Sequence, residues 1–256
     1  MTSLHAERTG QGPPLVLAHG FTQTGRLWGP FGDALAAHRL LVRVDLPGHG
    51  GSAAVRADLP AAGDLLLGAA GGDGPVDVLG YSLGARVALH AALRHPGRVR
   101  RLVLVGGTPG IEDPDARAAR RRRDEATADE LERSGDLEGF LRRWLAAPMF
   151  AGLRSPGMAE RLRNTPAGLA SSLRLAGTGA QLPLWDALGG LHVPVLVVAG
   201  AADVRFAGAG GRMARALPDA ALSLVPGAGH AAHLEQPALA AAIVAGFLGD
   251  GWGSTA

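Results

Sequence analysis

The fold is decided by the stretch Val76-Asp77-Val78-Leu79-Gly80-Tyr81-Ser82-Leu83-Gly84-Ala85-Arg86. Its first four residues form a short apolar run, which is typical of a buried strand. A G-x-S-x-G pattern follows, and the next ten residues predict a helix that ends before His95-Pro96. Strand, tight turn and helix in this order indicate a nucleophile elbow, in which small neighbours let the chain turn sharply and expose Ser82. A glycine-rich turn that merely contains a serine is the alternative.

Similar short apolar runs recur along the chain, at residues 15–18, 40–46, 99–105, 195–199 and 222–225. Their length and β-branched content predict strands buried on both faces of a mainly parallel sheet, with helices between most of them. The alternation predicts a doubly wound α/β core with catalytic groups at the carboxyl ends of its strands. No strand pattern occurs between residues 108 and 185. We therefore expect a core of residues 1–107 and 186–256 and a helical cap of residues 108–185.

An exposed serine needs a histidine to accept its proton and an acid to orient that histidine. Asp203 follows the strand pattern at 195–199, and His230 follows the pattern at 222–225 and a Pro-Gly-Ala-Gly turn. The chain order Ser, Asp, His is that of the α/β-hydrolase fold. We predict that fold, with Ser82, Asp203 and His230 as the catalytic triad. The competing candidates are His233 for the base and Asp186 or Asp219 for the acid.

Negative charge that develops on a substrate oxygen is stabilised by backbone N–H groups. One donor conventionally comes from the residue after the nucleophile and one from the loop after an early strand. Here these residues are Leu83 and Phe21. His19, beside Phe21, is expected to support this loop rather than to carry a proton.

Composition excludes several classes of protein. The 256 residues are 47% hydrophobic and 19% charged, as in an ordinary globular protein, and there is no cysteine for a disulfide or a thiolate metal site. All 25 basic residues are arginine, yet the net charge is only +2, so no nucleic-acid partner is expected. The first apolar run has only four residues, which favours a cytoplasmic protein without a membrane segment.

Arginines gather in the first predicted cap helix, which we expect to begin with Asp113 as N-cap and Pro114 at its first position. Helical spacing places Arg117, Arg120 and Arg121 on one face and the two arginines that follow elsewhere. A solvated face paired with Asp124 and Glu125 is the alternative. The next cap helix has an apolar stripe that includes Trp144, so this residue serves either the core or a ligand cavity.

Three stretches resemble one family, the 2-succinyl-6-hydroxy-2,4-cyclohexadiene-1-carboxylate synthases. They are the run from Val44 to Ala54 (VDLPGHGGSAA), the elbow from Gly80 to Arg86, and the run from Gly106 to Ile111 with the arginines that follow it. The similarity continues through Trp144, Pro148, Phe150 and Arg163 and covers nearly the whole chain. It departs from the family at Leu145, where a second aromatic residue is common.

The resemblance implies a lyase of menaquinone biosynthesis that removes pyruvate from a small substrate with three carboxylates, without a metal or an organic cofactor. By resemblance, Arg86, Arg120 and Arg163 bind these carboxylates, and Tyr81 and Trp144 lie in the pocket. Guanidinium groups suit the task because they bind carboxylates in a bidentate manner. Arg86 also stands out from its position alone, one helical turn after Ser82.

In the mechanism that we expect, His230 deprotonates Ser82, whose oxygen removes a ring proton from the substrate. A serine hydrolase of a small ester or a carbon-carbon bond is the alternative that uses the same triad. A binding module without catalytic activity is a third possibility, because the fold does not fix the function.

Overall fold

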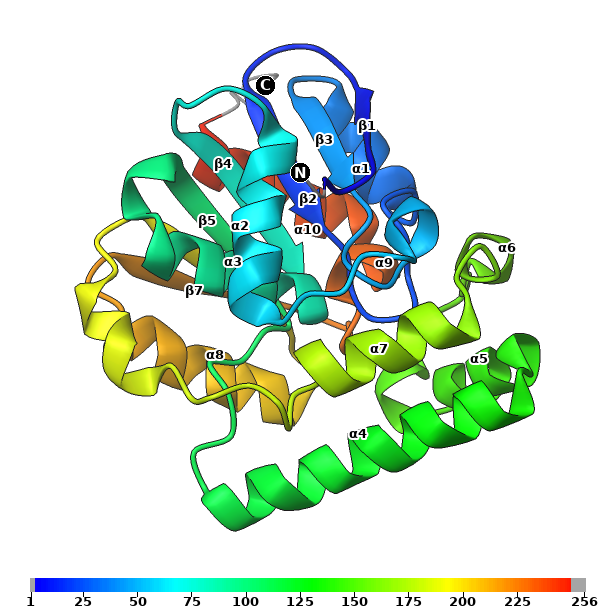
Figure 1. Cartoon of the computed structure of the whole chain (residues 1–256). Coiled ribbons are helices and arrows are strands. Elements are labelled where there is room, and N and C mark those ends of the chain that lie inside the picture. Colours follow the sequence, from blue (N-terminus) through cyan, green and yellow to red (C-terminus); the bar gives the residue numbers. More distant parts are fainter. Residues whose placement is uncertain (1–2, 250–256) are drawn as a thin grey trace.

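The computed structural model describes residues 3–249, and its centre is a seven-stranded sheet of order β1-β3-β2-β4-β5-β6-β7 (Figure 1). Every neighbouring pair is parallel except β1 with β3. The strands are β1 (Ala6–Thr9), β2 (Pro14–Ala18), β3 (Leu40–Val44), β4 (Val76–Tyr81), β5 (Val99–Val105), β6 (Val195–Gly200) and β7 (Ala220–Val225). The prediction of a mainly parallel α/β sheet is therefore confirmed.

Helices cover both faces of the sheet. On one face lie α1 (Gly29–Ala36) and α10 (Pro237–Leu248), which share an apolar cluster with the inward side chains of that face. On the other lie α2 (Leu59–Ala70), α3 (Leu83–Arg94) and α8 (Val204–Ala216). The central strands are nearly continuous apolar runs, as expected for strands that are buried on both faces.

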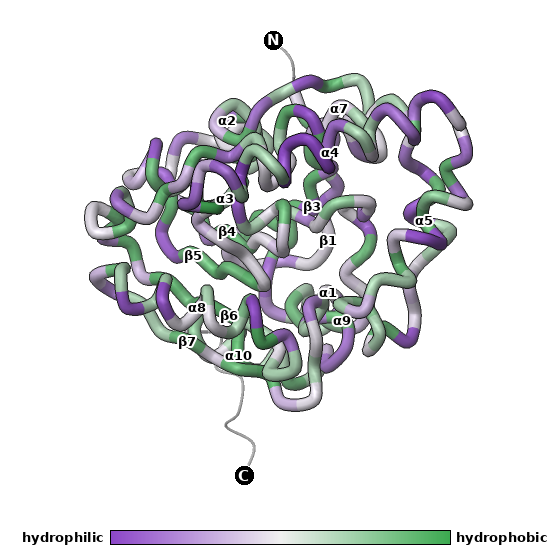
Figure 2. The backbone as a smooth tube through the Cα atoms, turned by 90° about the horizontal axis from the view of Figure 1, so that it is seen from below, coloured by the Kyte–Doolittle hydropathy of each residue, from purple (hydrophilic) through white to green (hydrophobic). Residues whose placement is uncertain are grey.

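The segment between β5 and β6 contains four α-helices and no strand. They are α4 (Pro114–Ser134), α5 (Leu137–Leu145), α6 (Met158–Arg161) and α7 (Pro166–Ala176). In Figure 1 they lie together along one edge of the core, and Figure 2 shows much of α4 in hydrophilic colours and the central strands in hydrophobic ones. Asp113 caps α4 by accepting a hydrogen bond from the N–H of Ala116 at 2.7 Å, as predicted.

The remaining elements are short. They are the 3-10 helices Gly50–Ser52, Pro96–Arg98, Pro148–Phe150 and Trp185–Gly190, and the helix α9 (Ala232–Glu235). Within residues 3–249, no helix is both long enough and apolar enough to cross a bilayer.

The predicted strands differ from the observed ones at the sheet edges. β1 was not predicted, because its four residues are half-buried or exposed and pair only along β3. β7 begins two residues earlier than expected and has an exposed side, so its apolar pattern is weaker than that of the central strands. In the centre of the sheet, Ala18 of β2 pairs with Gly80 of β4, which places the loop after β2 beside the turn after β4.

Candidate active site

Ser82 occupies the sharp turn between β4 and α3. Its φ angle is +51°, a left-handed value that is costly for a residue with a side chain. The flanking glycines permit the turn, since a Cβ at Gly84 would collide with the carbonyl of Ala18, and one at Gly80 with the backbone of Gly84. The turn therefore holds the serine hydroxyl at the carboxyl end of the sheet, where the sequence predicted an elbow.

A chain of two hydrogen bonds joins the three residues predicted as a triad. His230 Nε2 lies 3.0 Å from Ser82 Oγ, and His230 Nδ1 lies 2.8 Å from Asp203 Oδ2. Since the aspartate can only accept, Nδ1 carries the proton and Nε2 is the acceptor for the serine hydroxyl. The side chain of His230 is 2% exposed and that of Asp203 is 12% exposed. This arrangement can withdraw the proton of Ser82 and stabilise the imidazolium that results.

The two backbone positions predicted to bind an oxyanion lie beside Ser82. Phe21 and Leu83 both line the cavity onto which the serine opens. The amides on either side of Leu83 are used inside the fold, because Ser82 donates to the carbonyl of Val105 at 2.8 Å and Gly84 donates to that of His19 at 3.0 Å. The second bond ties the loop of Phe21 to the elbow.

His19 supports the loop through both ring nitrogens, as expected. Nδ1 donates to the carbonyl of Gly20 at 2.8 Å, and Nε2 accepts from the N–H of Leu46 at 3.1 Å. Burial lowers its pKa to about 4, so the ring is neutral near pH 7. His233, the rival candidate for the base, is fully buried against Trp28, Phe31 and Tyr81, and neither of its nitrogens has a hydrogen-bond partner among the described residues.

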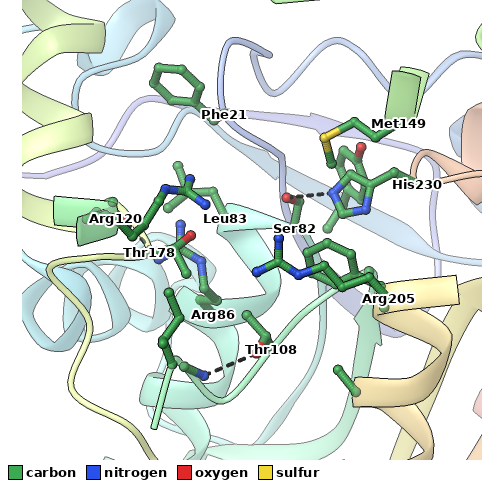
Figure 3. A pocket seen from close by; sticks show the side chains of 18 of the residues that line it. Phe21, Ser82, Leu83, Arg86, Thr108, Arg120, Met149, Thr178, Arg205 and His230 are labelled. Atoms are coloured by element: carbon green, nitrogen blue, oxygen red, sulfur yellow. Dashed lines mark hydrogen bonds between the residues drawn. The ribbon is translucent and has the colours of Figure 1, made fainter. Parts of the chain in front are cut away.

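Ser82 opens into a cavity of about 550 Å³ between the sheet and the helices α4 to α7 (Figure 3). Arg86 lines this cavity from α3 and is 7% exposed. Its Nη1 donates to the carbonyl of Ala176 at 2.7 Å, and burial and the neighbouring Arg120 lower its pKa to about 10. The group is still charged at neutral pH, so the cavity holds a guanidinium that has lost most of its hydration.

Arg120 reaches the same cavity from α4. Its Nε donates to Asp124 Oδ1 at 2.8 Å, one helical turn away, and its side chain is 27% exposed. The neighbouring Arg121 is exposed and pairs with Glu125. Both predictions for this helix therefore describe part of it: Arg120 faces the cavity, and the arginines also pair with the acids that follow them.

The structure corrects the placement of Arg163. Its side chain is 52% exposed, lies 3.6 Å from Glu160 and is outside the cavity. Arg161, two residues earlier, lines the cavity and is 2% exposed, with bonds to the carbonyl of Pro156 at 2.6 Å and to the hydroxyl of Thr22. Burial lowers its pKa to about 10. Residues two apart at the end of a one-turn helix point in different directions, and a match based on sequence does not distinguish them.

Aromatic residues form the rest of the wall. Tyr81 lines the cavity, is 3% exposed and packs against the rings of His230 and His233. Trp144 lines it from α5 and also packs on Phe21, with ring centroids 5.0 Å apart. The two readings of Trp144, core and cavity, thus apply together.

A further cation at the cavity was not predicted. Arg205, the second residue of α8, extends into the pocket below Ser82 in Figure 3. The sequence signal was slight: a single arginine two residues after the candidate acid.

The acids that line the cavity are already engaged. Glu112 forms an ion pair with Arg212, and Asp113 caps α4. In the part of the chain that the structure describes, no carboxylate is in ion-pair contact with the cavity residues Arg86, Arg161 or Arg205. The cavity is therefore a net positive site that suits a polycarboxylate. Residues 3–249 contain no group of three or more His, Asp or Glu side chains placed to hold a metal ion.

Comparison with known proteins agrees with this geometry. Residues 15–243 match the alpha/beta hydrolase family. The chain is 36% identical over 243 residues to 2-succinyl-6-hydroxy-2,4-cyclohexadiene-1-carboxylate synthase from Klebsiella pneumoniae, covering 92% of this chain and 94% of that protein. The solved structure of MenH from S. aureus superposes with a TM-score of 0.88 at 28% identity, over 98% and 99% of the two chains. A thermophilic esterase from Thermogutta terrifontis, solved with malate bound, gives 0.79 at 26% identity, over 96% and 92%.

Proposed function

Because the chain belongs to the 2-succinyl-6-hydroxy-2,4-cyclohexadiene-1-carboxylate synthase family of α/β hydrolases, we propose that it is a carbon-oxygen lyase of menaquinone biosynthesis. Its reaction eliminates pyruvate from 2-succinyl-5-enolpyruvyl-6-hydroxy-3-cyclohexene-1-carboxylate. The observation that carries the proposal is the hydrogen-bonded Ser82, His230 and Asp203, which open onto a cavity where Arg86, Arg161 and Arg205 form no ion pair with any described carboxylate. This combination suits proton removal from an anionic substrate.

The chemistry begins at the serine. His230, oriented by Asp203, takes the hydroxyl proton of Ser82, and the serine oxygen removes the ring proton next to the succinyl carbonyl. The electrons of that C–H bond shift through the ring double bond and expel the enolpyruvyl oxygen with the electrons of the broken C–O bond. The ring loses one proton, and the departing enolate gains one as it becomes pyruvate, so the protons balance.

Charge stabilisation is the second contribution of the site. We assign the backbone N–H groups of Phe21 and Leu83 to the enolate that forms on the succinyl carbonyl. Arg86 and Arg161 are assigned to substrate carboxylates, and Arg161 takes the role that the sequence suggested for Arg163. Arg120, which is paired with Asp124, adds positive charge to the same wall. Tyr81 and Trp144 shape the walls. No metal or organic cofactor enters these steps.

We further propose that residues 108–185 act as a cap over a core formed by residues 1–107 and 186–256. The proposal is supported by the position of α4, α5, α6 and α7 between β5 and β6 and by the cavity residues that α4 to α7 supply. The partner that we propose is a small polycarboxylate and not a nucleic acid, and the enzyme is expected to work in the cytoplasm.

The test supplies the enolpyruvyl substrate and couples released pyruvate to lactate dehydrogenase. We expect pyruvate well above the spontaneous rate, and Ser82→Ala should lower kcat by about 10³-fold or more. The exposed Ser155→Ala is the matched control and should retain full activity. Release of pyruvate only at the spontaneous rate by the wild-type protein would contradict the proposal.

A serine hydrolase remains the second candidate, because the same three residues serve acyl transfer and the Thermogutta esterase shares the fold. A panel of nitrophenyl esters separates the two. Rapid turnover with a burst of nitrophenol indicates an acyl-enzyme and a hydrolase, whereas slow or absent turnover together with pyruvate release indicates the lyase.

A further inference from the structure

Arg205 is the one cavity-lining arginine supplied by α8. It lies two residues after Asp203. In Figure 3 its side chain extends below Ser82 toward the middle of the pocket, and Arg86 and Arg120 lie to the left of it. Its guanidinium carbon is 5.7 Å from the centre of the Phe206 ring, and that ring packs on His230 at 4.4 Å. The cation is thus held close to the reacting groups by an aromatic contact.

Arg205 differs from the other cavity arginines in exposure and in bonding. Arg86 and Arg161 are buried and donate hydrogen bonds to backbone carbonyls, which fixes their positions. Arg205 is exposed. Across residues 3–249 it has neither an ion pair nor a hydrogen bond to an acid. It is therefore a cation at the cavity whose donors remain available to a ligand.

The proposed substrate has three carboxylates. Within residues 3–249, the cavity has three guanidinium groups without a carboxylate partner, those of Arg86, Arg161 and Arg205. Arg120 is already paired with Asp124. Two of the three are buried and suit the parts of the substrate that remain in the ring product. The third is exposed and suits the part that must depart into water.

We propose that Arg205 binds the carboxylate of the enolpyruvyl group, the fragment that leaves as pyruvate. The inference rests on the proposed function and assigns one carboxylate of that substrate to one side chain. The enolpyruvyl carboxylate carries the same charge before, during and after C–O cleavage. Arg205 therefore contributes nearly equally to binding of the substrate and of the transition state, and it raises the affinity for pyruvate as a product.

The test compares Arg205→Gln, Arg205→Lys and the wild-type protein in the coupled assay. Arg205→Gln should raise KM about tenfold and change kcat less than about threefold, since one charge-assisted bond is lost from ground and transition states alike. Arg205→Lys should recover part of the loss because it restores the charge without the fork. The control is Arg215→Gln, an exposed arginine on the same helix and outside the cavity, which should behave as wild type.

Product inhibition identifies the carboxylate. In this experiment the reaction is monitored by the ultraviolet absorbance of the ring product. Added pyruvate should inhibit the wild-type protein, and Arg205→Gln should weaken that inhibition about tenfold. Pyruvamide, which lacks the charge, should inhibit both proteins equally weakly.

An unchanged KM and unchanged pyruvate inhibition in Arg205→Gln would overturn the inference while wild-type pyruvate release left the proposed function intact. A raised KM with unchanged pyruvate inhibition would also overturn it, because Arg205 would then hold a carboxylate of the ring product. If the wild-type protein released no pyruvate at all, the proposed function would fail and the inference with it.

Discussion

Strand β4 has a group of arginines at each of its ends, and the two groups differ in one respect. Near its start, Asp77 is fully buried and bonds to Arg39 and Arg100, each at 2.6 Å, with Arg101 at 4.0 Å. Beyond its end, Arg86 and Arg161 are about as buried as Arg39, but among the residues described no carboxylate is in ion-pair contact with them. One group contains its own counter-ion, and the other does not.

The difference separates a structural charge cluster from a binding site. A buried ion pair with its partner in place costs desolvation but then resists change, because removal of either member leaves an uncompensated charge. Burial of a cation without an anion costs the same desolvation energy, and no ion pair within the protein offsets it. Such burial is reasonable only if a ligand supplies the anion. The following experiments test that contrast.

The largest expected effect is on stability, from Asp77→Asn. Removal of the carboxylate takes away the 2.6 Å ion pair that Asp77 forms with Arg39, which is 3% exposed, so the free energy of unfolding should fall by about 3–5 kcal/mol. Urea denaturation followed by circular dichroism measures this change. The control is Asp64→Asn, which removes an exposed carboxylate from Arg94 and His95 and should shift the midpoint little. Equal shifts for the two variants would remove the distinction between the clusters.

Arg86→Met should show the opposite pattern. We expect kcat/KM for the proposed substrate to fall about 100-fold, the loss of a charge-assisted contact in a desolvated pocket. Stability should fall by no more than about 1 kcal/mol, because the variant removes a buried charge and one bond to Ala176 while keeping an apolar stem. Denaturation and the coupled assay on the same preparation measure both. A large loss of stability would place Arg86 with the structural cluster.

His233→Phe tests how stability depends on pH when a buried titratable group is compensated neither by an acid of the protein nor by a ligand. Burial lowers the pKa of His233 to about 3, so the folded protein keeps this ring neutral while the unfolded chain takes up a proton below the ordinary value of 6.5. Stability that depends on this ring is complete above pH 6.5 and is lost as the pH falls toward 3. At pH 5 the variant should gain about 2 kcal/mol relative to wild type, beyond any difference at pH 7.5. Parallel stability curves across this range would contradict the assignment.

Ionic strength should give the smallest effect. Raising it from about 0.05 M to about 0.5 M screens a charged substrate as it approaches, so KM should rise about threefold. The stability difference between wild type and Asp77→Asn should stay constant, since that cluster is buried. A KM that does not respond to salt would argue against a polyanionic substrate.

The central parts of the fold and the triad positions followed from the sequence because local rules determine them. Val76–Tyr81 is buried on both faces, and the glycines at 80 and 84 permit a sharp turn, so strand, turn and Ser82 were predictable together. Asp203 and His230 were found because each follows a strand. β1 was missed because an edge strand with exposed residues has no apolar pattern.

The arginines of the cavity could not all be found in this way. Arg161 and Arg163 are two residues apart near a helix of a single turn, and only packing against Thr22 and Pro156 decides which of them turns inward. Arg205 has no pattern around it, and its place depends on where the axis of α8 points after β6. Tertiary geometry, rather than spacing, determines these positions.

The bond from the Gly84 amide to the carbonyl of His19 joins the nucleophile and the loop of Phe21 into one connected body. Few adjustments are open to that body, since added atoms at Gly80 or Gly84 would meet backbone. To accept a substrate of a different shape, the enzyme would therefore have to change in α4 to α7 and in the first turn of α8. Exchange of those segments between relatives is the route by which this scaffold would acquire a new specificity while its reaction centre stays unaltered.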